Sequence, residues 1–525
     1  MKLSRLIRRM DSLGLVAGPF PEKDPDVGAI HHRSGDVRPG GLFVAVPGFL
    51  SDGHDHIVEA LDRGAAAVAG QRSVIEKKKI LIPGTPLVQT EDSRKALGAI
   101  SAEFYGDPSK SLKVIGITGT NGKTTTSFIL ESVLKAAGLN PGVIGTVDCR
   151  YMGRTIETRT TTPESADLQR MMAEMLKGGA THVVLEVSSH AVDLSRIFGC
   201  RFDAGVFTNL TRDHLDYHKT MDGYWRCKKR FFTDFIAKSG KKDSAAIINR
   251  RDPRGRELFR ELGEGVGRPR LVSTGFGEGD MVRPLDFEIH SSGISGRAAV
   301  PGGSFALESG LAGRHNLENI LCAAGAAHAL GIPPRAMEEG IRRLKSAPGR
   351  LERVENDRGL FIYVDYAHTP DALENVLSTL KNLGTGRLVC VFGCGGDRDV
   401  EKRPMMGRIS GRLADLSIIT SDNPRTEDPD RIMAHVEKGA AQTCPKMYDP
   451  GTLKRLGFSE KGRALEPDRE KAIRLAIDAS RPGDVILIAG KGHEDYQIIG
   501  DKKIPFDDKK KVLEAIGGPG AGGGG

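Results

Sequence analysis

A glycine-rich segment with a lysine and several threonines carries the clearest chemistry in this chain. Residues 118–125 read Thr-Gly-Thr-Asn-Gly-Lys-Thr-Thr and follow a short apolar run at 114–117. Beyond them, apolar residues recur at helical spacing as far as Ala137, and Gly138 is a stop signal. In a strand–loop–helix unit of this kind, backbone N–H groups and the positive end of the helix converge on phosphate oxygens. The segment therefore predicts a nucleoside triphosphate site.

Two side chains in this loop have expected roles. Lys123 would meet the terminal phosphates, and Thr124 would offer its hydroxyl to Mg²⁺. Ile117 stands where the common form of this loop has a glycine, so a plain turn with a surface lysine is the alternative. The flanking strand and helix favour the phosphate site. The residues expected to contact ATP here are Gly119, Thr120, Asn121, Gly122, Lys123, Thr124 and Thr125.

Polar residues also follow later apolar runs in the middle of the chain. Glu186 lies near the end of the run at 182–187, and His214 belongs to a polar stretch at 208–218. Ligands of open α/β sheets bind at the carboxyl ends of strands, so both could hold Mg²⁺ or orient a ligand beside Thr124. Satisfied loop residues are the alternative. Lys228 lies in a Lys-Lys-Arg run, which spacing alone assigns to a solvated helix face.

Four polar segments follow apolar strands in the last third of the chain and should meet at one edge of a parallel sheet. Arg398 and Arg425 suit carboxylates, whereas Asp422 and Glu494 suit an ammonium group. This combination predicts an amino-acid site. The segments are residues 365–370, 393–399, 421–427 and 490–495.

Composition limits the class of protein. A chain of 525 residues with 39% hydrophobic and 27% charged residues fits a soluble protein of two to four domains. No apolar stretch reaches 18 residues, so no membrane span is expected. Seven scattered cysteines and no export signal predict reduced thiols in a cytoplasm. The net charge of +8, with interspersed acids and 5% aromatics, indicates anionic small substrates and no nucleic acid.

Alternating strands and helices predict an α/β fold with three domains and mainly parallel sheets. We expect a linker at 107–109 and a turn at 346–349. A basic, amphipathic helix is expected at the N-terminus, and a small antiparallel annex at 268–310. The expected divisions are 1–110, 111–345 and 346–516, followed by a flexible glycine-rich tail at 517–525.

Together these segments resemble the Mur ligase family, ATP-dependent enzymes that add amino acids to the peptidoglycan precursor. The resemblance runs from about Gly40 to Glu494. It implies an N-terminal UDP-binding α/β domain, a central P-loop-type ATPase domain and a C-terminal Rossmann-like domain, in a cytoplasmic and monomeric enzyme. Its motifs are residues 118–125, 186–190, 209–218, 315–316, 348–350, 365–370, 422–425 and 490–495.

The resemblance also implies roles for single residues. Asn316, Arg350 and Asp365 would touch the nucleotide, and Lys123 its phosphates. Lys228 matches the carbamylated lysine of the family, which overrides its assignment to a solvated face. The residues implied to place Mg²⁺ are Thr124, Glu186, His214 and Lys228, the last as a carbamate. Those implied to bind the precursor, UDP-N-acetylmuramoyl-L-Ala-D-Glu, are Ser34, Thr161, Thr162, Ser188 and Arg196. Nearby, Arg33, Gly35 and Leu194 depart from the family pattern.

The segment 422–425 resembles the part of the family that selects meso-diaminopimelate. This amino acid carries a second carboxylate that lysine lacks, and Arg425 could pair with it; such a charged hydrogen bond contributes roughly 1.5–3 kcal/mol. The implied binding set is Arg398, Asp422, Asn423, Pro424, Arg425, Gly490 and Glu494. The implied reaction joins meso-diaminopimelate to the D-Glu γ-carboxylate through an acyl phosphate. The alternatives are a lysine-adding relative, a folate-polyglutamate ligase and a nucleotide-switched binding protein without ligase activity.

Overall fold

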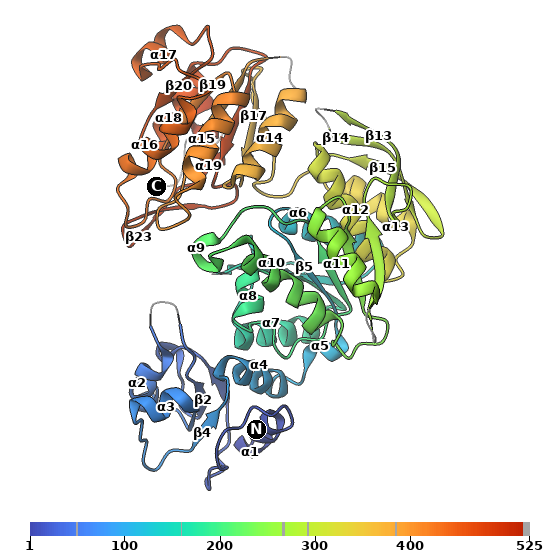
Figure 1. Cartoon of the computed structure of the whole chain (residues 1–525), viewed down its shortest axis with the longest axis vertical. Coiled ribbons are helices and arrows are strands. Elements are labelled where there is room, and N and C mark those ends of the chain that lie inside the picture. Colours follow the sequence, from blue (N-terminus) through green and yellow to red (C-terminus); the bar gives the residue numbers. More distant parts are fainter. Residues whose placement is uncertain (49–50, 159, 265–267, 291–292, 384–385, 518–525) are drawn as a thin grey trace.

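The computed structural model forms three α/β units, with the N-terminal unit (blue) and the C-terminal unit (orange to red) at opposite ends of a central one (Figure 1). This confirms the predicted fold class. Among the described helices, none combines the length and the apolar character needed to cross a bilayer. Residues 518–525 of the expected tail lie outside the described part. The structure describes residues 1–48, 51–158, 160–264, 268–290, 293–383 and 386–517.

The N-terminal unit is a four-stranded parallel sheet covered by helices. Its first helix, α1 (Leu3–Asp11), buries Leu3, Leu6, Ile7 and Met10, which confirms the predicted amphipathic helix. The strands, in sheet order, are β1 (Ala29–His31), β2 (Gly41–Val44), β3 (Ala67–Gln71) and β4 (Leu87–Thr90). The other α-helices in the described part of this unit are α2 (Ile57–Asp62), α3 (Arg72–Lys78) and α4 (Ser93–Phe104), and its 3-10 helices are η1 (Ser34–Asp36) and η2 (Gly53–His56).

The segment expected to be a linker at 107–109 is instead packed. It opens the short helix α5 (Pro108–Ser111), and Asp107 and Ser109 are both buried. Asp107 forms an ion pair with Lys110, and the hydroxyl of Ser109 accepts a hydrogen bond from the backbone N–H of Arg201 at 3.1 Å. The segment lies between α4 and β5, where a linker was predicted, and these contacts of Asp107 and Ser109 fix it in place.

An eight-stranded sheet forms the middle of the central unit. Strands β12 to β6 pair in parallel, and β7 and β8 extend one side as antiparallel strands. Alternate residues of β5 enter two cores. Ile115 packs with helices α6 (Lys123–Ala136), α12 (Arg314–Ala329) and α13 (Pro334–Arg343), and Val114 packs with α7 (Ser165–Lys177) and η3 (Phe231–Ile236). In sheet order the strands are β12 (Arg270–Thr274), β11 (Ala245–Asn249), β10 (Ala204–Phe207), β5 (Lys113–Thr118), β9 (His182–Glu186), β6 (Pro141–Ile144), β7 (Cys149–Tyr151) and β8 (Arg154–Ile156).

The remaining elements of the central unit surround this sheet. The antiparallel annex predicted at 268–310 begins only after β12, since β12 belongs to the main parallel sheet. The annex consists of β13 (Arg283–His290), β14 (Gly293–Val300) and β15 (Gly303–Ser309). The helical elements are α6 (Lys123–Ala136), α7 (Ser165–Lys177), α8 (Ser189–Asp193), α9 (Leu215–His218), α10 (Met221–Arg230), η3 (Phe231–Ile236), α11 (Pro253–Glu264), α12 (Arg314–Ala329) and α13 (Pro334–Arg343).

The C-terminal unit has a six-stranded sheet, parallel except for its edge strand β16. Helices α14, α15 and α16 pack on one face, and α17, α18 and α19 on the other. In sheet order the strands are β16 (Glu352–Val354), β17 (Phe361–Asp365), β21 (Val485–Ala489), β18 (Leu388–Phe392), β19 (Leu416–Ile419) and β20 (Gly462–Leu465). A hairpin of β22 (Tyr496–Ile499) and β23 (Lys502–Pro505) follows. The helices are α14 (Pro370–Leu383), α15 (Lys402–Leu413), α16 (Pro429–Ala440), α17 (Pro450–Leu456), α18 (Arg469–Asp478) and α19 (Asp508–Ile516).

Candidate active site

The glycine loop joins β5 to α6, as predicted. Gly119 and Gly122 have φ values of +152° and +86°. A Cβ on Gly119 would lie 1.9 Å from the hydroxyl oxygen of Thr208, and one on Gly122 would lie 2.2 Å from Oδ1 of Asn319. Glycine is therefore required at both positions. Gly122 is also the N-cap of α6 and has no side chain to cap the helix, so the first-turn N–H groups face the loop.

Two lysine amines converge on one carbonyl group beneath the loop. Lys123 Nζ donates to the carbonyl oxygens of Gly119 at 2.9 Å and Thr120 at 2.8 Å, and Lys228 Nζ donates to that of Gly119 at 2.7 Å. Burial lowers the pKa of both amines, and the charge of Lys123 lowers that of Lys228 further. The Lys228 side chain is only 1% exposed. Its assignment to a solvated helix face from spacing alone is wrong, because α10 turns this face inward with Tyr224 and Cys227.

Glu186 lies at the carboxyl end of β9, next to the loop. Its Oε2 accepts hydrogen bonds from the hydroxyls of Thr124 at 3.0 Å and Thr146 at 2.8 Å. Hydroxyl and carboxylate oxygens are ligands that suit Mg²⁺. Within the described ranges, no three His, Cys, Asp or Glu side chains form a ready-made metal cage. Mg²⁺ commonly uses one or two carboxylates with phosphates and water, so the donor set at Thr124 fits this ion.

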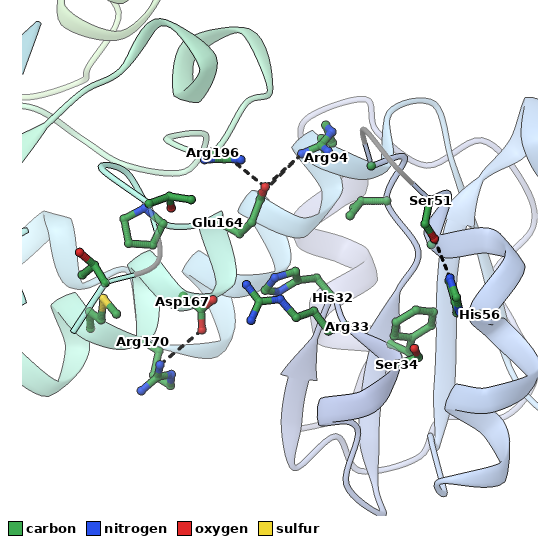
Figure 2. Close-up of a pocket in the computed structure, with 18 of the residues that line it drawn as sticks. His32, Arg33, Ser34, Ser51, His56, Arg94, Glu164, Asp167, Arg170 and Arg196 are labelled. Atoms are coloured by element: carbon green, nitrogen blue, oxygen red, sulfur yellow. Dashed lines mark hydrogen bonds and ion pairs between the residues drawn. The ribbon is translucent and has the colours of Figure 1, made fainter. Parts of the chain in front are cut away.

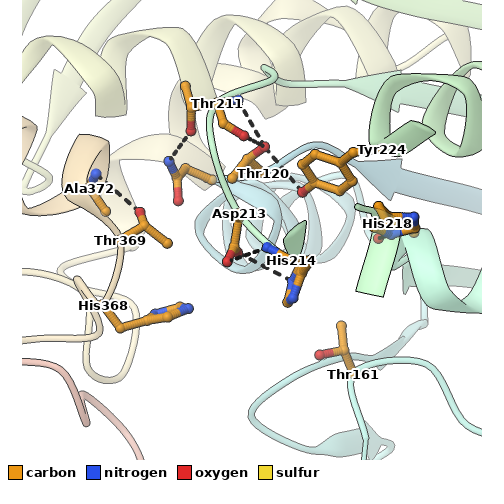
Figure 3. Close-up of polar contacts among 12 residues, drawn as sticks. Thr120, Thr161, Thr211, Asp213, His214, His218, Tyr224, His368, Thr369 and Ala372 are labelled. Carbon is orange, nitrogen blue, oxygen red and sulfur yellow. Dashed lines mark hydrogen bonds and ion pairs between the residues drawn. The ribbon is translucent and has the colours of Figure 1, made fainter. Parts of the chain in front are cut away.

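His214 lies in the turn before α9, below the loop (Figure 3). Its Nε2 is 3.3 Å from Oδ2 of Asp213, and its ring meets that of His190 edge-on at 5.0 Å. Burial lowers the pKa of His214 to about 3, so the ring is neutral near pH 7 and can offer a nitrogen lone pair. The Tyr224 hydroxyl lies 3.2 Å from that of Thr120, a contact drawn in Figure 3.

A cavity of about 300 Å³, here called the loop cavity, opens beside the glycine loop. Arg350 reaches it from the C-terminal unit, and its guanidinium donates to the Thr124 hydroxyl at 3.3 Å. Asp365 is fixed by backbone N–H groups of Leu351 at 2.6 Å and Ala367 at 2.7 Å, and burial raises its pKa. Of the residues expected to bind ATP, those lining this cavity are Asn121, Gly122, Thr125, Asn316, Arg350 and Asp365. Arg251 and Arg314 also line the cavity and contact the ring of Phe276, and no sequence motif marks them.

A second cavity, of about 550 Å³, lies between the N-terminal and central units and is called the N-side cavity (Figure 2). Ser34 and Arg196 line it, as expected for residues of one site. Arg33, which departs from the family pattern, lines it too. Arg196 Nε donates to Glu164 at 2.9 Å. Arg94 and Arg170 also line the cavity from helices α4 and α7, and no sequence motif marks them.

A third cavity, of about 500 Å³, lies where the central and C-terminal units meet and is called the junction cavity. Thr161, Ser188, Arg196 and His214 line it from the central unit. From the C-terminal unit it is lined by Arg398, Arg425, Glu494 and others. Thr162 lies behind it, fully buried, and its hydroxyl donates to the backbone carbonyl of Glu186 at 2.7 Å. In this structure Thr162 supports the wall that carries Glu186.

The four polar segments of the C-terminal unit meet at one sheet edge, as predicted. They surround a cavity of about 180 Å³, called the C-terminal cavity. Arg425 Nη1 donates to the carbonyl oxygen of Gly396 at 2.8 Å. Burial, followed by the charge of Arg398, lowers the pKa of Arg425, so an anion between the two guanidinium groups would be stabilised. The expected residues that line the cavity are Arg398, Asp422, Asn423, Arg425, Gly490 and Glu494; Pro424 is not among them. Tyr366, from the predicted segment 365–370, also lines the cavity, as does Lys402, which no sequence motif marks.

Comparisons with known proteins agree with this architecture. Residues 26–105, 117–327 and 349–492 match the families described as Mur ligase family catalytic domain, Mur ligase middle domain and Mur ligase glutamate ligase domain. A protein of Geobacter metallireducens named UDP-N-acetylmuramoyl-L-alanyl-D-glutamate–2,6-diaminopimelate ligase is 48% identical over 97% of this chain and 98% of its own. The corresponding protein of Geobacter sulfurreducens is 44% identical with the same coverage.

Solved structures also resemble this chain over most of its length. A structure titled as UDP-N-acetylmuramoyl-L-alanyl-D-glutamate–2,6-diaminopimelate ligase superposes with a TM-score of 0.64 and 31% identity, covering 96% of each chain. A folylpolyglutamate synthase of Mycobacterium tuberculosis has a TM-score of 0.60 over 75% of this chain and 91% of its own; at 18% identity this likeness concerns the fold alone. With three family domains matched in order and near-full-length relatives at 44–48% identity, this chain belongs to the Mur ligase family.

Proposed function

We propose that the chain is an ATP-dependent ligase that adds meso-diaminopimelate to the D-Glu γ-carboxylate of UDP-N-acetylmuramoyl-L-Ala-D-Glu, in the synthesis of the peptidoglycan precursor. One observation carries the proposal: the cavities form a series. The N-side and junction cavities share Arg196, and the junction and C-terminal cavities share Arg425 and Glu494. A UDP-linked peptide held in the N-side cavity would therefore extend toward an amino acid held in the C-terminal one.

The first step of the proposed reaction activates the precursor. A γ-carboxylate oxygen of D-Glu attacks the γ-phosphorus of ATP, a new O–P bond forms, and the bond to the ADP oxygen breaks. Lys123 and the N–H groups at the start of α6 neutralise the charge that develops on the phosphoryl oxygens. Thr124, Glu186, His214 and Lys228, the last as a carbamate, would hold Mg²⁺, which when bound supplies further neutralisation of phosphate charge. The low pKa of the buried Lys228 amine favours the neutral form that carbamate formation needs.

The second step forms the amide bond. The neutral amine of diaminopimelate attacks the acyl carbon, and inorganic phosphate leaves. Asp422 and Glu494 would receive an ammonium group of this substrate, and Arg398 and Arg425 its distal carboxylate. The junction cavity lies between the two units and would place the acyl phosphate beside the amino acid.

Substrate dependence tests the proposal directly. We would measure phosphate release from ATP with UDP-N-acetylmuramoyl-L-Ala-D-Glu and either meso-diaminopimelate, L-lysine or no amino acid. Release only with meso-diaminopimelate, together with a tripeptide product by mass spectrometry, is the expected result. Release with lysine alone would preserve the ligase and overturn the substrate. Hydrolysis that is indifferent to the amino acid would favour a nucleotide-switched binding protein.

The proposal also locates the enzyme in the cytoplasm, where ATP and UDP-linked precursors are available. We also propose that a monomer is active. Turnover per chain should then be independent of protein concentration. A specific activity that rises with concentration would contradict a monomer.

A further inference from the structure

A buried lysine lies behind the C-terminal cavity. Lys491 follows β21 and Gly490, and its side chain is fully buried. Its amine donates to Oδ1 of Asn423 at 3.0 Å and to the carbonyl oxygen of Tyr496 at 2.8 Å. It also lies 3.2 Å from Oδ1 of Asp422 and 3.7 Å from Oε2 of Glu494. A buried charge is costly unless it is paired, and these four oxygens surround the amine.

These contacts fix the orientation of Asn423. Its Oδ1 accepts from Lys491 and also from the backbone N–H of Ile498 at 2.9 Å. The amide nitrogen must then point the other way, and it donates to Oε2 of Glu494 at 3.0 Å. Glu494 is thus held through one oxygen, while its Oε1 lies 3.5 Å from the Tyr366 hydroxyl at the junction cavity. Lys491 therefore determines how both side chains are presented to a ligand.

Charge balance gives Lys491 a second effect. Burial tends to raise the pKa of Asp422, but the charge of Lys491, then that of Arg469, outweighs burial and lowers it. Burial, followed by the charge of Asp422, raises the pKa of Glu494. Asp422 lines the cavity, and its buried Oδ1 lies 3.2 Å from the Lys491 amine. Without the lysine, two carboxylates would face the ligand with one positive charge fewer.

We propose that Lys491 is a positioning residue that orients Asn423 and Glu494. Its charge also makes the C-terminal cavity bind a zwitterionic diamino diacid in preference to a monocarboxylic diamine. This inference rests on the proposed function. Near pH 7, meso-diaminopimelate has no net charge, whereas L-lysine carries one positive charge. Removing Lys491 makes the cavity more negative, which weakens binding of the second carboxylate and strengthens binding of the cation.

The test compares Lys491→Met and Lys491→Gln with the wild-type enzyme. We expect the KM for meso-diaminopimelate to rise roughly tenfold or more, because charge-assisted contacts are lost. The KM values for ATP and for the UDP-linked precursor should stay within about twofold. The ratio of the Ki of L-lysine, as a competitor, to the KM of meso-diaminopimelate should fall by more than about tenfold, because the KM rises while the Ki does not. A general loss of structure would not move this ratio in that direction.

Arg463→Met is the matched control. Arg463 is a buried cation in β20 that donates to Glu437 at 2.7 and 2.8 Å, and it lines none of the four cavities. We expect its ratio of Ki to KM to match the wild type even where the protein is less stable. If Lys491→Met does not fold, Lys491→Gln carries the comparison, since it retains a hydrogen-bond donor and much of the side-chain volume.

A double variant separates positioning from simple loss of charge. If Lys491 acts through Asn423, the effects of Lys491→Gln and Asn423→Ala on the KM of meso-diaminopimelate should not multiply. Multiplying effects, an unchanged ratio of Ki to KM, or equal shifts in all three KM values would overturn the inference. A wild-type enzyme without turnover of meso-diaminopimelate would instead refute the proposed function itself.

Discussion

Lys123 and Lys228 bring two amines to the same carbonyl oxygen of Gly119, at 2.9 and 2.7 Å. Burial lowers the pKa of both amines; the charge of Arg350 lowers that of Lys123 further, and the charge of Lys123 lowers that of Lys228. A bound polyphosphate would restore the charge of Lys123. Lys228 is the more buried of the two, and its pKa is lowered by burial and by the charge of Lys123, so it is the amine better suited to stay neutral and react with CO₂.

The first prediction concerns Lys123. Lys123→Ala should lower turnover by roughly a hundredfold or more, because a charge that acts on the transferring phosphoryl group is removed. Phosphate release with all three substrates measures the effect, and circular dichroism checks the fold. Lys135→Ala is the control, since this lysine lies on the same helix, is 60% exposed and pairs with Glu131. Near-normal turnover of Lys123→Ala would contradict the proposed role of the loop.

The second prediction concerns Arg425. Arg425→Ala should raise the KM for meso-diaminopimelate by roughly tenfold to a hundredfold, because one or more charged hydrogen bonds are lost. The KM for ATP should stay unchanged, since Arg425 does not line the loop cavity. Arg408→Ala, which removes an exposed arginine bonded to Gln442 on the same unit, is the control. If the KM for meso-diaminopimelate is the same in Arg425→Ala and Arg408→Ala, Arg425 does not bind this substrate.

At the scale of elements, buried strands and the loops after them were predictable from the sequence. Strands β17 and β21 are uninterrupted apolar runs because both faces of the sheet are covered, and their polar ends mark the sheet edge. The hairpin of β22 and β23 was missed, since β23 is exposed along its length and reads as polar. The burial of Lys228 and of Lys491 could not be predicted either, because it depends on which faces other elements cover.

The third prediction concerns the pairing of two C-terminal helices. Arg469 at the start of α18 and Asp508 at the start of α19 form a bidentate ion pair at 2.8 and 2.7 Å, with both side chains fully buried. Asp508→Ala would leave a buried guanidinium without its partner, so the free energy of unfolding should fall by roughly 3–5 kcal/mol. Urea unfolding of the full chain measures this change.

Glu470 supplies the matched comparison for that variant. It pairs with Arg474 at 3.0 Å and with Lys511 at 2.8 Å, and it joins the same two helices from a solvated position, 33% exposed. Glu470→Ala should cost at most about 1 kcal/mol, because exposed ion pairs are screened by water. Equal losses in Asp508→Ala and Glu470→Ala would show that burial does not determine the strength of this contact.

At the scale of the whole molecule, polar contacts hold the C-terminal unit against the central one. Arg212 donates to Asp399 at 3.1 Å and to Glu401 at 2.6 Å, and Asn121 of the glycine loop donates to Asp371 at 2.9 Å. Asp399 neighbours Arg398 of the C-terminal cavity, and Arg212 lies two residues before His214. The contacts therefore connect the loops that would carry the amino acid and the phosphate. The sequence motifs predicted these loops. They did not predict the contact between Arg212 and Asp399, because the two residues are 187 positions apart in the sequence.

The last prediction follows from this connection. Arg212→Ala should lower kcat by roughly tenfold, because the amine and the acyl phosphate would meet less often in a reactive geometry. The KM for ATP should change little, and the radius of gyration in solution with ATP and precursor bound should increase. Lys503→Ala is the control, since Lys503 also bridges the two units, to Glu157 at 3.4 Å, but both side chains are more than half exposed. If kcat and the radius of gyration of Arg212→Ala equal those of Lys503→Ala, the Arg212 contacts do not hold the reactive arrangement, and the packing of the junction cavity itself must do so.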